Sequence, residues 1–371
     1  MWVDIFLSFK VLISQNMSKI ALVVGATGIT GSNLAEKLIE KGWTTYGLAR
    51  NPETDIEGLI PISADLLNPE NLAIKLTDIA PTHVFFTTWM RNDTEAENIR
   101  INGAMVRNLL KCLSEKQSIQ HVALVTGLKH YLGPFEAYAK AGTLPETPVR
   151  EEHPRLDLEN FYYAQEDEVY AASARDGFTW SIHRPHSVIG KAVGNLMNMG
   201  TTLAVYASLC KEMGRPFQFP GSAEQWNGLT DVTDAKILAD QIIWAATTEA
   251  AHNEAFNIAN GDVFRWKWLW KQIAGWFGVE AAGFDGTIRS LEADMAGDVP
   301  LWQEIATKYN LKEPSLNRLA SAWHTDLDLG RPLEVMTDMS KSRKLGFTVY
   351  QDTRDSFFGL FEKLRLEKLI P

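Results

Sequence analysis

The sequence predicts an α/β protein built on a doubly wound parallel sheet. In the first half of the chain, short segments rich in aliphatic residues alternate with longer segments whose apolar residues recur at helical spacing. Aliphatic strands of this kind are typical of a parallel sheet that is covered on both faces. The first strand also leads directly into a glycine-rich turn that opens a helix. Together these features predict a sheet with helices packed on both sides.

The elements are expected in a regular order along the chain. We expect strands over residues 20–24, 44–48, 59–63, 83–87, 121–125 and 179–183. We expect helices over residues 33–40, 68–76, 98–113, 159–175 and 355–366, with a further amphipathic helix over 267–277. We assign residues 17–194 to a nucleotide-binding domain, to which residues 228–260 return. Residues 195–227 and 261–371 are assigned to a smaller, mostly helical substrate-binding lobe.

Composition and charge exclude several classes of protein. The chain has 371 residues, of which 45% are hydrophobic and 22% charged, and its formal net charge is -10. This acidic balance speaks against binding to nucleic acid or to an anionic membrane. The two cysteines are far apart and the eight histidines show no metal-ligand spacing, so we expect no disulfide framework and no metal site. A cytoplasmic location fits this cysteine usage, and a homodimer is one expectation for the oligomeric state.

Residues 1–16 do not share the pattern of the rest of the chain. Lys10 interrupts their apolar run, and neither a basic start nor a small-residue cleavage pair is present, so a signal peptide is not expected. The run is also too short and too broken to cross a membrane. Because Met17 stands just before the first strand, we expect residues 1–16 to be an N-terminal extension or to precede the native start.

The glycine-rich turn predicts a dinucleotide site of the Rossmann type. Gly25 permits a tight exit from the strand, Gly28 lets a pyrophosphate approach the backbone, and Gly31 lets helix and strand pack closely. A pyrophosphate would then face the N-terminus of the helix, where unpaired N–H groups favour anions. An ordinary strand-to-helix turn is the simpler alternative, but the preceding strand and the following helix favour the nucleotide. The residues expected to contact the cofactor here are Gly25, Thr27, Gly28, Ile29, Thr30 and Gly31.

The second strand ends in a way that favours NADPH over NADH. NAD-specific sites commonly place a carboxylate there for the ribose 2′-hydroxyl, whereas this chain has Arg50–Asn51 and no acid before Glu53. A guanidinium at Arg50 suits a 2′-phosphate, although a surface arginine is the simpler alternative. After the third strand, Asp65 and Leu66 are expected beside the adenine, unless Asp65 caps the next helix. The residues assigned to the cofactor on this side are Arg50, Asn51, Asp65, Leu66 and Thr88.

The expected catalytic tyrosine lacks its usual lysine. Ordinary short-chain dehydrogenases carry Tyr-x-x-x-Lys on one helix face, but four residues after Tyr162 and Tyr163 this chain has Glu166 and Asp167. A lysine, Lys129, instead occurs in the segment Thr126–Gly127–Leu128–Lys129–His130–Tyr131, which ends the fifth strand.

These motifs resemble those of the progesterone 5β-reductase and iridoid synthase family, which are atypical extended short-chain dehydrogenases. The resemblance rests on Thr-Gly-x-Lys-His-Tyr, Asn-Phe-Tyr-Tyr-x-x-Glu-Asp, Thr87–Thr88–Trp89, Gly133–Pro134–Phe135–Glu136, His183–Arg184–Pro185 and the segment 253–262, and it extends from about Ile20 to Pro371. It implies an NADPH-dependent reduction of the C=C bond of an enone, with Tyr162 and Lys129 as the catalytic pair. A phenol aimed at the carbonyl oxygen would stabilise the developing enolate, and a nearby ammonium would strengthen that donor.

The resemblance also implies where the substrate and the nicotinamide bind. An apolar carbonyl substrate is expected against Trp89, Phe135 and Tyr138, and we also assign Ser187 to the substrate. The residues matching positions beside the nicotinamide are Val188, Asn195, Leu196 and Met197. Two departures put a steroid or terpenoid substrate in doubt: His186–Ser187 stand where the family often has Gly-Asn, and the pair Val335–Met336 replaces an aromatic pocket residue.

Two other functions are compatible with this fold. An NADP-binding regulator would need the glycine turn but neither Tyr162 nor Lys129, so their joint presence argues against it. An NAD-dependent sugar-nucleotide epimerase or dehydratase would keep Tyr-x-x-x-Lys and an acid at the end of the second strand, and this chain has neither.

Overall fold

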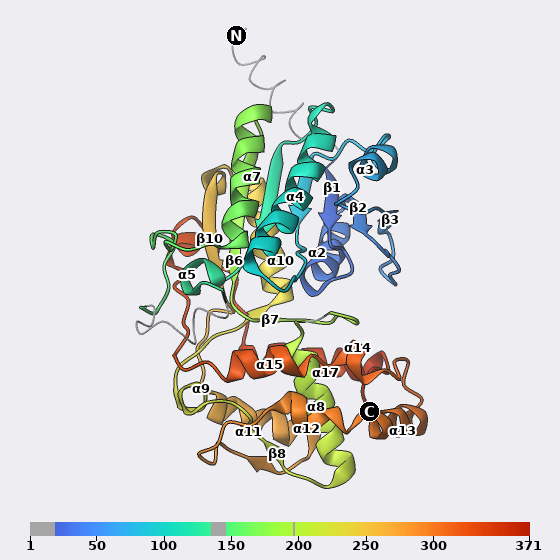
Figure 1. Cartoon of the computed structure of the whole chain (residues 1–371), viewed down its shortest axis with the longest axis vertical. Helices are drawn as coiled ribbons and strands as arrows, with labels where there is room; N and C mark the ends of the chain where they lie inside the picture. Colours follow the sequence, from blue (N-terminus) through green and yellow to red (C-terminus); the bar gives the residue numbers. More distant parts are fainter. Residues whose placement is uncertain (1–18, 135–145, 196) are drawn as a thin grey trace, which may run out of the picture.

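A seven-stranded parallel sheet forms the centre of the protein (Figure 1). The computed structural model describes residues 19–134, 146–195 and 197–371, so the segment 1–16 lies outside the described residues. In spatial order the strands are β10 (Glu254–Ile258), β6 (Thr179–Pro185), β5 (His121–Val125), β4 (His83–Phe86), β1 (Ile20–Val24), β2 (Thr44–Ala49) and β3 (Ile60–Ser63). The predicted fold class, a doubly wound parallel sheet, is confirmed.

The strand order reverses between β1 and β4. From β1 the chain continues outward through β2 and β3, then returns to place β4 on the other side of β1. Such a reversal opens a crevice at the carboxyl ends of the two strands, where ligands bind in folds of this type. The glycine turn follows β1 at this edge and Thr87–Trp89 follow β4, so both segments meet at the crevice.

Helices cover both faces of the sheet, and successive residues of a strand point to opposite faces. Ala21 and Val23 pack with the helices on one face, whereas Leu22 and Val24 pack with those on the other. The first face is covered by α2 (Ile29–Glu40) and α10 (Ala235–Thr247). The second face is covered by α3 (Pro69–Lys75), α4 (Glu95–Ser114) and α7 (Phe161–Asp176), the last two lying side by side (Figure 1). Burial on both faces explains why the strands are aliphatic.

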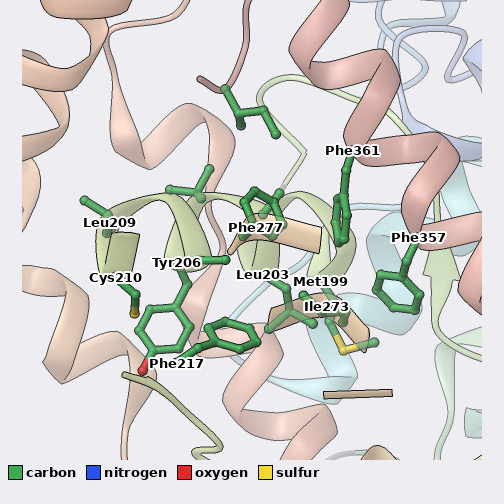
Figure 2. Packing of buried hydrophobic residues seen from close by; sticks show 14 of the residues in the cluster. Met199, Leu203, Tyr206, Leu209, Cys210, Phe217, Ile273, Phe277, Phe357 and Phe361 are labelled. Atoms are coloured by element: carbon green, nitrogen blue, oxygen red, sulfur yellow. The ribbon is translucent and has the colours of Figure 1, made fainter. Parts of the chain in front are cut away.

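A second hydrophobic core lies among helices beyond the carboxyl edge of the sheet (Figure 1). Figure 2 shows part of this core, where the ring of Tyr206 lies 5.1 Å from that of Phe217 and the ring of Phe277 lies 5.0 Å from that of Phe361 on another helix. Trp270 stacks flat on Phe217, with ring centroids 4.0 Å apart. The helices here are α8 (Met199–Met213), α9 (Ala223–Asn227), α11 (Trp266–Phe277), α12 (Leu291–Ala296), α13 (Val299–Tyr309), α14 (Leu316–Leu319), α15 (Ala322–Leu329) and α17 (Thr353–Leu366). The domain boundaries drawn from the sequence stay a prediction.

Short elements complete the chain. They are α5 (Lys129–Leu132), β7 (Val188–Ile189), β8 (Phe217–Gln218), β9 (Thr233–Asp234), a 3₁₀ turn (Glu249–Ala251), β11 (Ala281–Ala282) and α16 (Ser340–Lys344). Most predicted strands begin and end within two residues of the observed ones, but the helix α2 begins four residues before the predicted Asn33. In the part of the chain that the structure describes, no helix is long and apolar enough to span a membrane.

Candidate functional site

The glycine turn has the geometry that a pyrophosphate cradle requires. Gly25 has φ +87°, and a Cβ added there would lie 2.7 Å from Cβ of Thr88, so a side chain is excluded. A Cβ on Gly31 would lie 2.2 Å from the carbonyl oxygen of Gly25, which confirms that this glycine lets helix and strand touch. Gly28 caps α2 without any side-chain hydrogen bond, and a Cβ added there would have Asn195, at 3.6 Å, as its nearest side chain. The first N–H groups of α2 therefore stay available for an anion.

One cavity of about 420 Å³ joins the glycine turn to the expected catalytic residues. Most of the described residues that the sequence assigned to cofactor or substrate line it: Gly25, Thr27, Gly28, Ile29, Thr30, Arg50, Thr88, Trp89, Lys129, Tyr162, Ser187, Val188, Asn195 and Met197. These residues come from the segments that follow β1, β2, β4, β6 and β7, from β7 itself and from the helices α2, α5 and α7. Phe135, Tyr138 and Leu196 lie outside the described residues.

A smaller hollow continues from this cavity toward the end of β3. It shares Arg50 and Thr88 with the main cavity and is also lined by Asp65 and Leu66, as expected for the adenine side. The carboxylate of Asp65 accepts a hydrogen bond from the backbone of Leu67, and the cap of α3 is Asn68 rather than Asp65. The remaining residue assigned to this side, Asn51, is not among the described residues that line either hollow.

Among the three neighbouring tyrosines, Tyr162 is the one that lines the cavity. It stands in the first turn of α7, where its N–H donates to the side chain of Asn160 at 3.0 Å, and its hydroxyl lies beside Gly127. Tyr163 is committed elsewhere: its hydroxyl donates to the carbonyl of His130 at 2.6 Å. The hydroxyl of Tyr131 donates to Asn257 at 2.6 Å, and burial raises the pKa of this phenol to about 12.

Lys129 lies near Tyr162, just beyond the end of the fifth strand as the sequence indicated, but on a short helix that was not expected. β5 ends at Val125, and Lys129 begins the short helix α5. Its ammonium lies over three aromatic rings, at 4.9 Å from the centroid of Phe161, 5.1 Å from Trp89 and 5.9 Å from Tyr162. Such contacts hold a cation in place by the negative faces of the rings.

One side chain joins the two elements that carry this pair. Asn160 accepts the N–H of Tyr162 through its oxygen, and its amide nitrogen donates to the carbonyl of Lys129 at 2.8 Å. The start of α7 is thereby fixed to the start of α5. Asn160 is buried, so these hydrogen bonds are protected from water. The sequence indicated Asn160 only as part of a family motif, and its role follows from the contacts.

Glu166 occupies the position where ordinary short-chain dehydrogenases carry the lysine. Its carboxylate is buried and pairs with Arg155 at 2.8 Å and Arg184 at 3.3 Å. It is not among the described residues lining the cavity. The carboxylate therefore joins the start of α7 to β6 and is not placed to act in the cavity.

Several lining residues escaped the sequence interpretation, and five of them carry charged or aromatic side chains. Trp323, His324 and Asp328 project from α15, Arg331 follows that helix, and Arg91 follows β4. Ser187, which was assigned to the substrate, donates its hydroxyl hydrogen to Asp328 at 2.7 Å.

The expected loss of an aromatic side chain at Val335–Met336 does not apply to this cavity. Val335 is buried in a separate cluster with Leu128 and Tyr131, and neither Val335 nor Met336 is among the described lining residues. Trp323 supplies an aromatic wall instead. Within the described ranges, no group of three or more His, Cys, Asp or Glu residues is arranged to hold a metal ion.

Comparisons with known proteins agree with the resemblance seen in the sequence. Residues 61–371 match the family described as PRISE-like Rossmann-fold domain. The chain is 39% identical to a 3-oxo-Δ(4,5)-steroid 5β-reductase of Arabidopsis thaliana, with 96% of this chain and 95% of that protein covered. It is 37% identical to an (S)-8-oxocitronellyl enol synthase of Nepeta cataria, with 96% and 94% covered.

Solved structures with a similar fold include two sugar-nucleotide enzymes. The UDP-glucose 4-epimerase of Thermus thermophilus in complex with NAD superimposes with a TM-score of 0.66 at 14% identity, covering 93% of this chain and 99% of that one. The UDP-glucose 4-epimerase of Thermotoga maritima with UDP-glucose gives 0.65 at 14% identity, covering 94% and 99%. At such low identity these structures show the fold alone. By its family match and its curated relatives, the chain belongs to the PRISE family, the progesterone 5β-reductase and iridoid synthase-like branch of the Rossmann-fold proteins.

Proposed function

We propose that this protein is an NADPH-dependent reductase of the C=C bond of enones, with Tyr162 and Lys129 as its catalytic pair. The observation that carries the proposal is that Tyr162, Lys129 and the glycine turn line one cavity. The printed names of the two relatives fit this chemistry. A 3-oxo-Δ(4,5)-steroid is an enone, and an enol forms when hydride adds to the β-carbon of an unsaturated aldehyde and the oxygen of the resulting enolate takes a proton.

The residues of the site fit a nicotinamide dinucleotide. Gly25, Gly28 and Gly31 leave room for a pyrophosphate at the N-terminus of α2. Arg50 lines both hollows and forms no ion pair with a described carboxylate, which suits a 2′-phosphate and hence NADPH. NADPH, when bound, supplies the hydride.

Tyr162 and Lys129 act on the carbonyl oxygen of the substrate. Tyr162 donates a hydrogen bond to that oxygen, on which negative charge grows as the β-carbon gains a hydride. The ammonium of Lys129, held against the ring of Tyr162, stabilises the same charge. The α-carbon then takes a proton from water, so one hydride and one proton saturate the double bond. Trp89 lies under Lys129 and offers the substrate an aromatic wall.

The test is turnover of a weakly activated, ketone-type enone at saturating NADPH, followed by loss of the NADPH absorbance. Tyr162→Phe should lower kcat by about a hundredfold or more, because one donor to the oxyanion is lost, while NADPH affinity changes little. Lys129→Met should act in the same direction. The double variant should be little worse than the worse single one, as for residues that act as a unit.

The adjacent tyrosine provides a matched control. Tyr163→Phe removes a buried hydroxyl that is bonded to the backbone of His130, so its effect on kcat at a permissive temperature should be small. Turnover by Tyr162→Phe at the parent rate would refute the catalytic assignment. Absence of any enone reduction by the parent protein across a panel of ring and linear enones would refute the function itself.

A further inference from the structure

The part of the cavity beside α15 is rich in positive charge. We call it the α15 end, and it comprises Arg91, Lys129, His324, Asp328 and Arg331. Of the charged residues in the described lining, Arg50, Arg91, Lys129 and Arg331 are cations, and Asp328 is the one carboxylate. This balance is opposite to that of the whole chain, whose formal net charge is -10. The dinucleotide and the proposed chemistry account for Arg50 and Lys129, so Arg91 and Arg331 are the lining cations that an apolar substrate would leave without a role.

Arg331 is held in the wall by a chain of buried contacts. Its guanidinium donates to Nε2 of His186 at 2.7 Å and pairs with Asp328, and its side chain is only 10% exposed. Because arginine cannot accept a hydrogen bond, Nε2 of His186 must be the acceptor in this contact. The proton of the imidazole is therefore on Nδ1, which donates a hydrogen bond to Asp231 at 2.8 Å. His186 is therefore neutral and adds no charge to the α15 end.

Arg91 is placed at the same end by Trp323. Its guanidinium carbon lies 4.1 Å from the centroid of the indole ring. Stacking occupies the face of a guanidinium and leaves its in-plane N–H groups directed outward. Arg91 forms no ion pair with a carboxylate of the described residues, although most of the other described arginines do.

His324 lies close enough to these cations for their charges to act on its imidazole. Its side chain is 12% exposed, and Nδ1 has no hydrogen-bond partner among the described residues. Burial lowers the pKa of this imidazole; Asp328 opposes the shift, and Arg331, Lys129 and Arg91 add to it. Among the described residues that line the α15 end, Asp328 is the one anion near this imidazole.

We propose that the substrate of this protein is an enone that carries a carboxylate, and that Arg91, His324 and Arg331 bind that carboxylate. The inference rests on the proposed function, because Tyr162 and Lys129 would hold the carbonyl of the same molecule. An anion at the α15 end gains charge-assisted hydrogen bonds from Arg91, and the positive charge of Arg331 adds to its attraction.

The test compares a linear enone that has a terminal carboxylate with the methyl ester of the same compound. The parent protein should reduce the acid with a kcat/KM about tenfold or more above that of the ester, and added salt should raise KM for the acid alone. Arg91→Gln should lower the acid-to-ester ratio about tenfold. Arg91 is exposed, so this substitution leaves the core intact. Arg100→Gln, an exposed arginine of α4 that pairs with Glu97, is the matched control and should leave the ratio unchanged.

Binding gives a second readout that does not depend on turnover. With NADP⁺ bound in place of NADPH no reduction can occur, so calorimetry reports the Kd of the acid and of the ester directly. Equal affinity for both, or a ratio that Arg91→Gln does not change, would overturn the carboxylate site while enone reduction stands. Reduction of neither compound, with no binding of either, would refute the proposed function together with this inference.

Discussion

Buried histidines across the sheet should make the protein sensitive to mild acid. His83 and His183 are 5% and 0% exposed and lie on β4 and β6, with His121 on the strand between them. Burial lowers the pKa of His83 to about 4, with Lys19 adding to the shift. Burial likewise lowers the pKa of His183 to about 4, against an opposing hydrogen bond from Gln241.

The sign and size of the effect follow from proton binding. The folded protein keeps both imidazoles neutral, whereas the unfolded chain protonates them near pH 6.5. The stability that the two neutral imidazoles contribute to the folded protein is therefore fully present above pH 6.5 and is lost as the pH falls toward 4. At pH 5 each group lowers the free energy of unfolding by about 2 kcal/mol relative to neutral pH, and the pair lowers it by about 4 kcal/mol. The free energy of unfolding of a typical protein is roughly 5–15 kcal/mol, so this loss is a large part of the total.

The assay is urea unfolding followed by tryptophan fluorescence between pH 7.5 and pH 5. The free energy of unfolding should fall with decreasing pH, and His183→Gln should reduce that fall by about 2 kcal/mol because one titrating group is gone. Glutamine keeps a polar side chain toward Ser181 and Gln241. The readout is the slope with pH, so a variant that is less stable at every pH still tests the idea. A parent protein with no slope in this range, or a variant with the parent's slope, would refute the reasoning.

Three further substitutions test the site. Arg50→Ala should raise the KM for NADPH at least several-fold while changing the KM for NADH little, and a parent protein with equal affinity for the two cofactors would contradict this assignment. Asn160→Ala should lower kcat and also the melting temperature, because it removes a helix cap worth about 1 kcal/mol together with the bond to Lys129; unchanged kcat would exclude a positioning role. Gly31→Ala should abolish tight cofactor binding measured by calorimetry, because its Cβ would lie 2.2 Å from an oxygen of Gly25.

The sheet and the cofactor cradle could be predicted because their signals are local. The strand Ile20–Val24 and the turn after it are contiguous in the chain, and each glycine has a geometric reason that is visible in the spacing alone. The pair that we propose as catalytic was predicted only through a family resemblance, since Lys129 lies 33 positions before Tyr162 and no periodicity joins them.

The wall formed by α15 could not be predicted in the same way. His324, Asp328 and Arg331 reach the cavity because the second hydrophobic core places their helix there, and nothing in the local sequence shows which side of α15 faces the sheet. Helix α10 was also missed, although its buried residues recur at helical spacing; the sequence was interpreted there as part of a returning segment only. Long-range packing decides such contacts, and one sequence does not reveal it.

The division of the proposed catalytic pair between α5 and α7 affects how the protein should lose activity. In an ordinary short-chain dehydrogenase the two groups are one helical turn apart, so a helix that stays wound keeps them together. Here their separation depends on how two helices dock, with Asn160 as the link. Heating that loosens this contact should inactivate the protein at a lower temperature than the one at which circular dichroism reports loss of helix. A bound substrate that contacts both groups should bring the two temperatures together.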